Sequence, residues 1–265
     1  MTNIKDNTVD NVTKKAWEEN WDAISVEKIL NIFSYVRVKK QMDIFLRYLP
    51  KGRKIFEGGC GLGPYLIRLR QLGYDVIGGD YNLPPLLKIK RYDANVPVVC
   101  ADVLNTPFCD SSFGAYMSLG VIEHFTQGPE AAIQEGRRIL KEGGIFIIQI
   151  PINNVLRALR QPIDMLKRNA FVRRLLKQPE KIYYWEQYIP PKKLINLMKE
   201  NGFDVQSAVP IDHTHNLCTF CGALFRDKKS YDEANTFGIR LGAFLEKVLP
   251  WSTASQTIFI CKKAA

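Results

Sequence analysis

The sequence predicts an α/β protein with a central, mostly parallel sheet covered by helices on both sides. Three observations support this prediction. Short apolar runs alternate with helical patterns along residues 51–151, as in repeated strand–helix units. A turn rich in glycine, Glu57 to Gly63, joins the first apolar run to a helical pattern. Asp80 ends the second run and Asp102 follows the third, at the edge where open α/β sheets bind nucleotides.

The glycine-rich turn reads Glu57-Gly58-Gly59-Cys60-Gly61-Leu62-Gly63. Its alternating glycines allow backbone conformations that a Cβ forbids, and they let a ligand approach the main chain. A dinucleotide fingerprint needs Gly-x-Gly-x-x-Gly. Counting from Gly59 puts Pro64 at the last position, and counting from Gly61 puts Leu66 there. The third glycine is missing in both registers, which disfavours a nicotinamide oxidoreductase.

The segments that follow the turn in the sequence predict four more strands. Asp80 ends the second strand, where a carboxylate can accept both hydroxyls of a ribose. The third strand leads into Ala101-Asp102-Val103, and the fourth leads into Gly120-Val121-Ile122-Glu123-His124-Phe125. The predicted strands fall within Tyr74–Asp80, Val96–Cys100, Phe113–Leu119 and Leu140–Pro151.

The acidic-x-Gly-x-Gly-x-Gly turn and these segments, in this order and spacing, resemble the class I S-adenosylmethionine-dependent methyltransferases of small-molecule type. The resemblance covers residues 51–151 in detail, and 191–209 and 257–262 more loosely. It implies a three-layer Rossmann-like fold with a seven-stranded sheet, mostly parallel with an antiparallel last strand, plus helical additions. Pro84 and Pro85 depart from the pattern and predict a short or irregular second helix.

The resemblance also implies the cofactor, S-adenosyl-L-methionine, and the residues that bind it. Asp102 is expected to accept the adenine amino group. The implied cofactor-binding residues are Glu57, Gly58, Gly59, Gly61, Gly63, Asp80, Tyr81, Asp102, Val103 and Leu119.

Two residues after the fourth strand are candidates for catalysis. His124 is the first candidate for a general base, because it lies beside the expected crevice and imidazole titrates near neutral pH. The alternative is that His124 only orients its loop or caps the next helix. Glu123 is the second candidate, with a side chain expected to point away from that of its neighbour.

The chain divides into four predicted parts. A helical cap at 1–50 precedes the cofactor-binding core at 51–150. A basic helical insertion at 151–193 is expected to form a lid, and 194–265 completes the sheet with a second helical insertion at 211–253.

Two helices are expected within the cap. One begins at Thr13 and brings Trp17 and Trp21 onto one face, and a longer one at 26–49 ends at Pro50. In the family that the chain resembles, N-terminal helices of this kind often close over the cofactor. The alternative is that these aromatic residues only anchor the helix to the sheet.

Charge is the second informative feature. The formal net charge is +10, and residues 151–193 hold ten Lys or Arg residues against three acidic ones. One interpretation is a lid with a solvated basic exterior. Another is peripheral contact with an anionic membrane surface, helped by Tyr183, Tyr184 and Trp185. Nucleic acid is disfavoured, because residues 118–121 carry neither the Pro-Pro motif of base amino methylation nor a nucleophilic cysteine.

Length and composition predict a globular domain of enzyme size in a reducing cytoplasm. The 265 residues are 46% hydrophobic, and no apolar run reaches the length of about 18 residues typical of a spanning helix. The polar N-terminus lacks the apolar region of a secretory signal. Six scattered cysteines do not resemble a disulfide framework. No metal site is predicted, because the ligand types His213, His215, Cys218 and Cys221 are too close in sequence to enclose zinc readily.

These observations predict in-line methyl transfer to an O or N nucleophile of a small molecule, with an amphiphilic, lipid-linked or sugar-linked acceptor preferred. Two alternatives stay open: an RNA or protein methyltransferase, and a non-catalytic cofactor-binding module of the same fold. An aminopropyltransferase is disfavoured because the basic insertion would repel a polyamine. The sequence indicates neither the acceptor nor an oligomeric state.

Overall fold

The computed structural model describes residues 17, 20–21, 23–168, 186–227 and 233–264. The chain forms two compact units. The larger unit holds residues 1–150, 184–209 and 258–265, and the smaller holds 151–183 and 210–257. Tyr183, Tyr184 and Trp185 of the predicted lid lie outside the described residues. The predicted four-part division of the chain stays a prediction.

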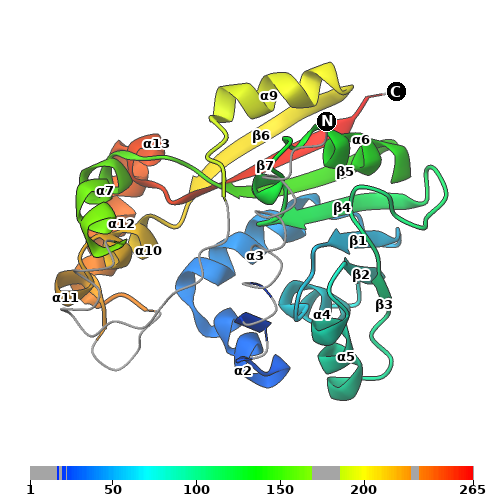
Figure 1. Ribbon diagram of the computed structural model, residues 1–265, viewed down its shortest axis with the longest axis horizontal. Coiled ribbons are helices and arrows are strands. Elements are labelled where there is room, and N and C mark those ends of the chain that lie inside the picture. The colour runs from blue at the N-terminus through cyan, green and yellow to red at the C-terminus, as the bar shows by residue number, and fades with distance from the viewer. Residues whose placement is uncertain (1–16, 18–19, 22, 169–185, 228–232, 265) are drawn as a thin grey trace. The chain divides into compact units, whose positions relative to one another are not determined.

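The larger unit is built on a seven-stranded sheet with the order β3-β2-β1-β4-β5-β7-β6 (Figure 1). Parallel pairing joins β3 to β2, β2 to β1, β1 to β4 and β4 to β5. The last strand is antiparallel, so the predicted Rossmann-like fold is confirmed. The strands are β1 (Ile55–Gly58), β2 (Val76–Asp80), β3 (Val98–Cys100), β4 (Phe113–Leu119), β5 (Leu140–Pro151), β6 (Phe203–Ile211) and β7 (Gln256–Lys263).

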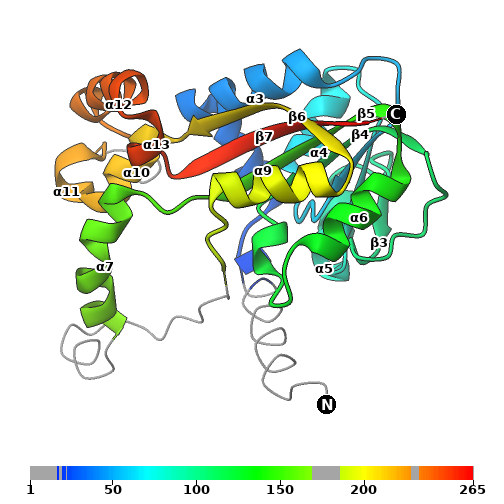
Figure 2. The ribbon, with the colours of Figure 1, turned by 90° about the horizontal axis from the view of Figure 1, so that it is seen from above.

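Helices cover both faces of this sheet, which gives the three layers (Figure 2). One face carries α4 (Pro64–Gln71) and α5 (Leu83–Tyr92), with Leu66 of α4 against Gly78 of β2. The other carries α6 (Glu130–Ile139) and α9 (Pro191–Glu200), whose apolar residues join the main core. Ile133, Leu194 and Met198 are fully buried there beside Phe146 of β5. Burial of these stripes is the dominant stabilising contribution.

Two helix predictions need correction. The second helix, expected to be short or irregular, is a regular ten-residue helix, α5. Pro84 and Pro85 fall in its first turn, where the amide that proline lacks has no partner within the helix. The long helix expected at 26–49 is divided into α2 (Val26–Leu30), the 3₁₀ helix η1 (Asn31–Ser34) and α3 (Val36–Tyr48). The division falls at Tyr35, whose backbone is extended and precedes α3.

The smaller unit is helical in its described part. It contains α7 (Val155–Arg168), α10 (His213–Phe220), α11 (Gly222–Phe225), α12 (Thr236–Val248) and α13 (Pro250–Thr253). Its small core joins Leu217, Cys218 and Phe225, with Leu156 of α7 packed against them. The two predicted insertions therefore contribute to one compact unit. No helix in the described part of the chain has the length and apolar character needed to span a membrane.

Candidate active site

The candidate site lies at the carboxyl ends of β1, β2 and β4. Gly58, the last residue of β1, pairs with Gly79 of β2 on one side and with Ser118 of β4 on the other. The chain crosses from one side of β1 to the other here, because β2 and β3 lie on one side and β4 and β5 on the other. In open α/β sheets this change of direction opens the crevice in which ligands bind. The predicted cofactor turn leaves β1 at this point.

The turn takes a backbone course that requires glycine. Gly59, Gly61 and Gly63 have φ of 72°, 52° and 62°, in the left-handed region. Space is also limiting, since a Cβ on Gly61 would lie 2.6 Å from the ring of Trp21, and a Cβ on Gly59 would overlap Val121. The turn then leads into the N-terminus of α4, where free amides and the helix dipole favour negative charge.

Asp80 ties the turn to β2. One carboxylate oxygen accepts from the Gly61 amide at 2.8 Å, and the other accepts from the Asn82 amide at 2.8 Å. Burial raises the pKa of Asp80, and the hydrogen bonds from Asn82 and Gly61 oppose that shift. Each oxygen keeps a second lone pair, so the carboxylate can also accept a ribose hydroxyl. Asp80 thus holds the turn on β2, and its interaction with a ribose stays a prediction.

Glu57 is a buried carboxyl group beneath the turn. Burial raises its pKa to about 8, the Leu66 amide opposes the shift, and Asp80 adds to it. Its Oε2 atom has no hydrogen-bond partner among the described residues. A buried acceptor without a donor is costly unless a ligand satisfies it. S-adenosylmethionine carries ammonium and sulfonium charges, and a positive charge nearby would favour the ionised form of Glu57. The glycine cradle and this carboxyl group therefore fit the cofactor.

The remaining predicted cofactor residues lie along the same edge. Tyr81 follows β2 with an exposed side chain, and Val103 is buried after β3. Leu119 is the last residue of β4 and is half-buried. Asp102 is exposed, and one of its carboxylate oxygens accepts from the Leu104 amide at 2.9 Å. This leaves its other oxygen available for an adenine amino group.

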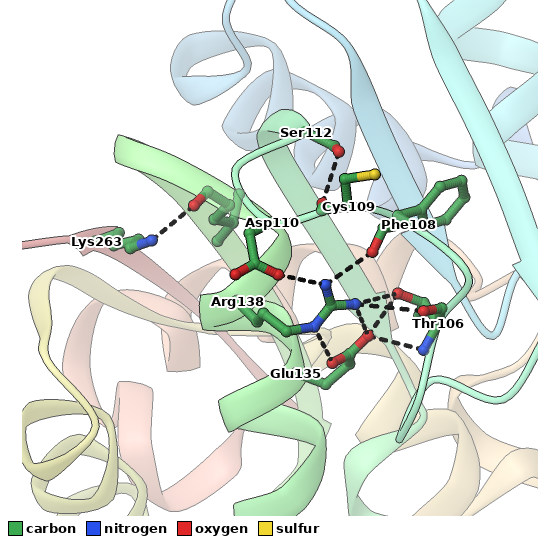
Figure 3. A network of polar contacts seen from close by, with 9 residues as sticks. Thr106, Phe108, Cys109, Asp110, Ser112, Glu135, Arg138 and Lys263 are labelled. Carbon is green, nitrogen blue, oxygen red and sulfur yellow. Dashed lines mark hydrogen bonds and ion pairs between the residues drawn. The ribbon is translucent and has the colours of Figure 1, made fainter.

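A polar network supports the loop that follows Asp102 (Figure 3). Arg138 of α6 forms a two-point contact with Glu135, and it donates to the Phe108 carbonyl at 2.7 Å and to Asp110 at 2.6 Å. Glu135 accepts from the amide and the hydroxyl of Thr106. Burial would raise the pKa of Glu135, but the hydrogen bonds from Arg138 and Thr106 outweigh burial and lower it. These contacts attach the loop at 106–110 to α6.

The two predicted catalytic residues lie in the 3₁₀ helix η2 (Ile122–His124). His124 is half-buried, and its ring meets the ring of Trp17 edge-on with centroids 5.5 Å apart. Glu123 is buried, and burial raises its pKa to about 8, with a smaller repulsion from Glu186. The backbone amide of Gln187 donates to the Glu123 carbonyl at 2.9 Å, which attaches η2 to the segment around Gln187. Glu123 is thus enclosed by protein, whereas the ring of His124 lies against Trp17.

Glu123 gives a testable dependence of stability on pH. Its folded pKa of about 8 lies above its ordinary value of 4.5, so the folded state holds the proton more tightly. Ionisation therefore favours the unfolded state as pH rises from about 4.5 to about 8. We expect Glu123→Gln to unfold at the same temperature as the wild type or below it near pH 5, and above it near pH 9. Thermal unfolding at both pH values, with the exposed Glu200→Gln as control, measures the difference.

Several residues at the site were not predicted. Trp21 lies against Gly61, and its ring stacks on Trp17 at 5.2 Å. Lys88 of α5 donates to the Trp21 carbonyl at 2.7 Å, which attaches this N-terminal segment beside the turn. The spacing of Trp17 and Trp21 predicted a shared helix face, but not the contact of Trp21 with Gly61 of the turn.

His213 and Cys218 of α10 take structural positions. Nδ1 of the buried His213 lies 2.8 Å from the Thr253 hydroxyl, and the buried Cys218 thiol donates to the Phe225 carbonyl. In the described part of the chain, no group of three or more His, Cys, Asp or Glu residues is arranged to hold a metal ion.

Comparison with known proteins agrees with this geometry. Residues 56–148 match the family model described as a methyltransferase domain. The human "Probable tRNA methyltransferase 9B" is 40% identical over 108 residues, which are 40% of this chain and 23% of that protein. The Arabidopsis thaliana "tRNA (carboxymethyluridine(34)-5-O)-methyltransferase" is 32% identical over 143 residues, 52% of this chain and 33% of that one. The matches thus span about a quarter to a third of these relatives.

A solved structure extends the likeness of fold. The "SAM dependent methyltransferase from Archaeoglobus fulgidus" superposes with a TM-score of 0.58 at 18% identity, covering 85% of this chain and 93% of that chain. The matched segment at 56–148 runs from β1 to β5 and contains every predicted cofactor residue. Residues 56–148 therefore form a methyltransferase domain of the class I S-adenosylmethionine-dependent type, with S-adenosylmethionine as its cofactor.

Proposed function

We propose that this chain transfers a methyl group to an oxygen or nitrogen nucleophile by in-line displacement. The observation that carries the proposal is the glycine turn fixed by Asp80 at the carboxyl end of β1. When bound, S-adenosylmethionine supplies a methyl carbon that is electrophilic and a thioether leaving group. The acceptor lone pair would form the new bond to this carbon, the carbon–sulfur pair would go to sulfur, and the acceptor proton would go to a base or to water.

The chain's residues contribute mainly position and exclusion of water. Holding two reactants in line can contribute on the order of 7–11 kcal/mol, whereas a general base adds about 10²–10⁴-fold. Trp17 and Trp21 stack beside the turn and η2, where they would shield the cofactor from water. His124 is the candidate base, since its ring is half-buried beside Trp17 and imidazole titrates near neutral pH.

Replacing His124 by Ala tests this role. We expect turnover to fall by about 10²–10⁴-fold if the imidazole accepts the acceptor proton, with affinity for S-adenosylmethionine nearly unchanged. The rate–pH profile of the wild type should lose its limb near neutral pH in the variant. Steady-state kinetics with calorimetry measures both quantities. A collapse of cofactor affinity in His124→Ala would instead assign the residue a structural role through Trp17.

RNA is the acceptor class that the named relatives favour. The human and Arabidopsis proteins carry tRNA methyltransferase in their names, and the formal net charge of +10 suits a polyanion. This support comes from matches that cover 40% and 52% of this chain. RNA is thus a stronger candidate than the sequence motifs alone indicated.

An amphiphilic small molecule is the second candidate, and a different observation favours it. The smaller unit exposes large aliphatic and aromatic side chains on α7 and α12. Phosphates and ribose offer these side chains no favourable contact, whereas an acyl or isoprenoid chain does. A lipid-linked or sugar-linked acceptor is consistent with such a surface.

One assay separates the two candidates. Release of S-adenosylhomocysteine is measured with unmodified total tRNA and, separately, with lipid-linked sugars and fatty acids in detergent micelles. Turnover on tRNA that is abolished by ribonuclease supports the RNA acceptor. Turnover only in the micelle series supports the amphiphile. A protein that binds S-adenosylmethionine and stays inactive on a broad acceptor panel would favour the non-catalytic module.

A further inference from the structure

The smaller unit carries an exposed apolar surface on two of its helices. Leu159 and Met165 of α7 are 61% and 65% exposed, and Phe237 and Phe244 of α12 are 56% and 58% exposed. Both helices contact α10, so one small core supports them. Clusters of exposed large apolar residues mark interaction sites more often than isolated ones do.

Helix α7 presents its apolar residues outward. Leu156 packs on the unit's small core, and this contact fixes the rotation of the helix. The side chains at 155, 158, 159 and 162 (Val, Ala, Leu, Pro) are then all exposed, and Met165 continues them. Positions i, i+3, i+4 and i+7 form one continuous stripe. Arg157 and Arg160, outside this stripe, are half-buried. The orientation is opposite to that of an ordinary surface helix, which turns its apolar stripe toward the core.

Helix α12 combines aromatic and basic residues on its exposed face. Gly238 and Gly242 are buried, and a Cβ on Gly242 would collide with Thr214 of α10, so this side faces inward. The opposite side exposes Phe237, Phe244 and Val248 beside Arg240 and Lys247. The single acidic residue of α12, Glu246, is half-buried. Trp251 follows on α13 and is also exposed.

We propose that the exposed faces of α7 and α12 dock on the surface of an anionic phospholipid bilayer. Aliphatic side chains gain free energy only by leaving water, which the acyl region permits. Exposed aromatic rings and cations are the residue types that settle at the headgroup level. Charge complements the partner, since the exposed face of α12 carries Arg240 and Lys247, whereas the one acidic residue of this helix is half-buried. The inference goes beyond methyl transfer and does not depend on the acceptor.

Co-sedimentation with vesicles tests the proposal without cofactor or acceptor. The probes are vesicles of phosphatidylcholine alone and of an equimolar mixture of phosphatidylcholine and phosphatidylglycerol. We expect the wild type to bind the anionic vesicles more tightly than the neutral ones, by about tenfold or more. This binding should weaken as the salt concentration rises. Leu159→Glu and Phe244→Glu should each lower anionic-vesicle binding by about tenfold or more, because each removes a large apolar contact and adds repulsion.

The matched control is Val36→Glu. Val36 of α3 is 54% exposed in the larger unit, so the change adds the same charge at a similar exposure away from the proposed surface. It should leave vesicle binding unchanged, and circular dichroism should show all variants folded. The proposal is overturned if the wild-type protein binds neither type of vesicle. It is also overturned if Leu159→Glu and Phe244→Glu bind the anionic vesicles as tightly as the wild type does. Sedimentation velocity that shows a dimer lost in these variants, without vesicle binding, would assign the surface to a second copy.

Discussion

Replacing Asp80 by Ala is expected to abolish detectable binding of S-adenosylmethionine. The carboxylate accepts from the amides of Gly61 and Asn82, each at 2.8 Å, and it lies where a ribose would donate to it. Hydrogen bonds to charged groups contribute about 1.5–3 kcal/mol each, so loss of the ribose contacts and of the turn's fixed position should exceed a 100-fold loss in affinity. Isothermal titration calorimetry measures this change directly.

A matched variant separates the ribose contact from general damage. Asp102 is also acidic and also follows a strand at this edge, but its carboxylate is exposed and accepts from the Leu104 amide. Asp102→Ala should weaken the binding of S-adenosylmethionine less, by roughly tenfold. That loss is equivalent to one hydrogen bond of about 1.4 kcal/mol. Unchanged affinity in a folded Asp80→Ala protein would contradict the assignment of the ribose site.

Replacing Gly61 by Ala is expected to have the second large effect. The residue has φ of 52°, where an L side chain costs roughly 1–2 kcal/mol, and its new Cβ would lie 2.6 Å from the Trp21 ring. Either the ring or the turn must shift, and the Gly61 amide that anchors Asp80 shifts with the turn. We expect S-adenosylmethionine affinity to fall by about 100-fold or more, as judged by the same calorimetric titration.

Gly52→Ala isolates the conformational part of that cost. Gly52 has φ of 74°, but an added Cβ there would meet no atom within 4 Å. The variant should lose about 1–2 kcal/mol of stability, a few degrees in melting temperature, and keep its cofactor affinity. If both glycine variants bound S-adenosylmethionine equally well, the close packing of Trp21 on the turn would play no part in the site.

The sequence predicted the cofactor side of this protein well because its signals are local. A glycine that needs positive φ and an acidic residue at a strand end are each fixed by a few neighbouring residues, so Gly61 and Asp80 could be placed from their spacing. The register of the glycines mattered most, since it separated this turn from a dinucleotide fingerprint. The prediction of a short or irregular helix from Pro84 and Pro85 was wrong. The effect of proline depends on its position in a helix, and the first turn tolerates it.

Contacts between distant segments could not be predicted from a single sequence. Trp21 meets Gly61 across forty positions of chain, and Gln187, within the predicted basic insertion, donates to the Glu123 carbonyl. The exposed stripe of α7 shows the same limit. Its amphipathic pattern predicted a helix, but only the contact of Leu156 with the core reveals that the apolar side faces outward. Burial of Glu123, which raises its pKa to about 8, likewise depends on packing around η2.

The turn from Glu57 to Gly63 is expected to bind S-adenosylmethionine and not a dinucleotide. Isothermal titration calorimetry of the wild-type chain with S-adenosylmethionine, and in parallel with NAD, distinguishes the two. The predicted result is saturable binding of S-adenosylmethionine with one site per chain, and no heat from NAD. Saturable binding of NAD without binding of S-adenosylmethionine would contradict the account.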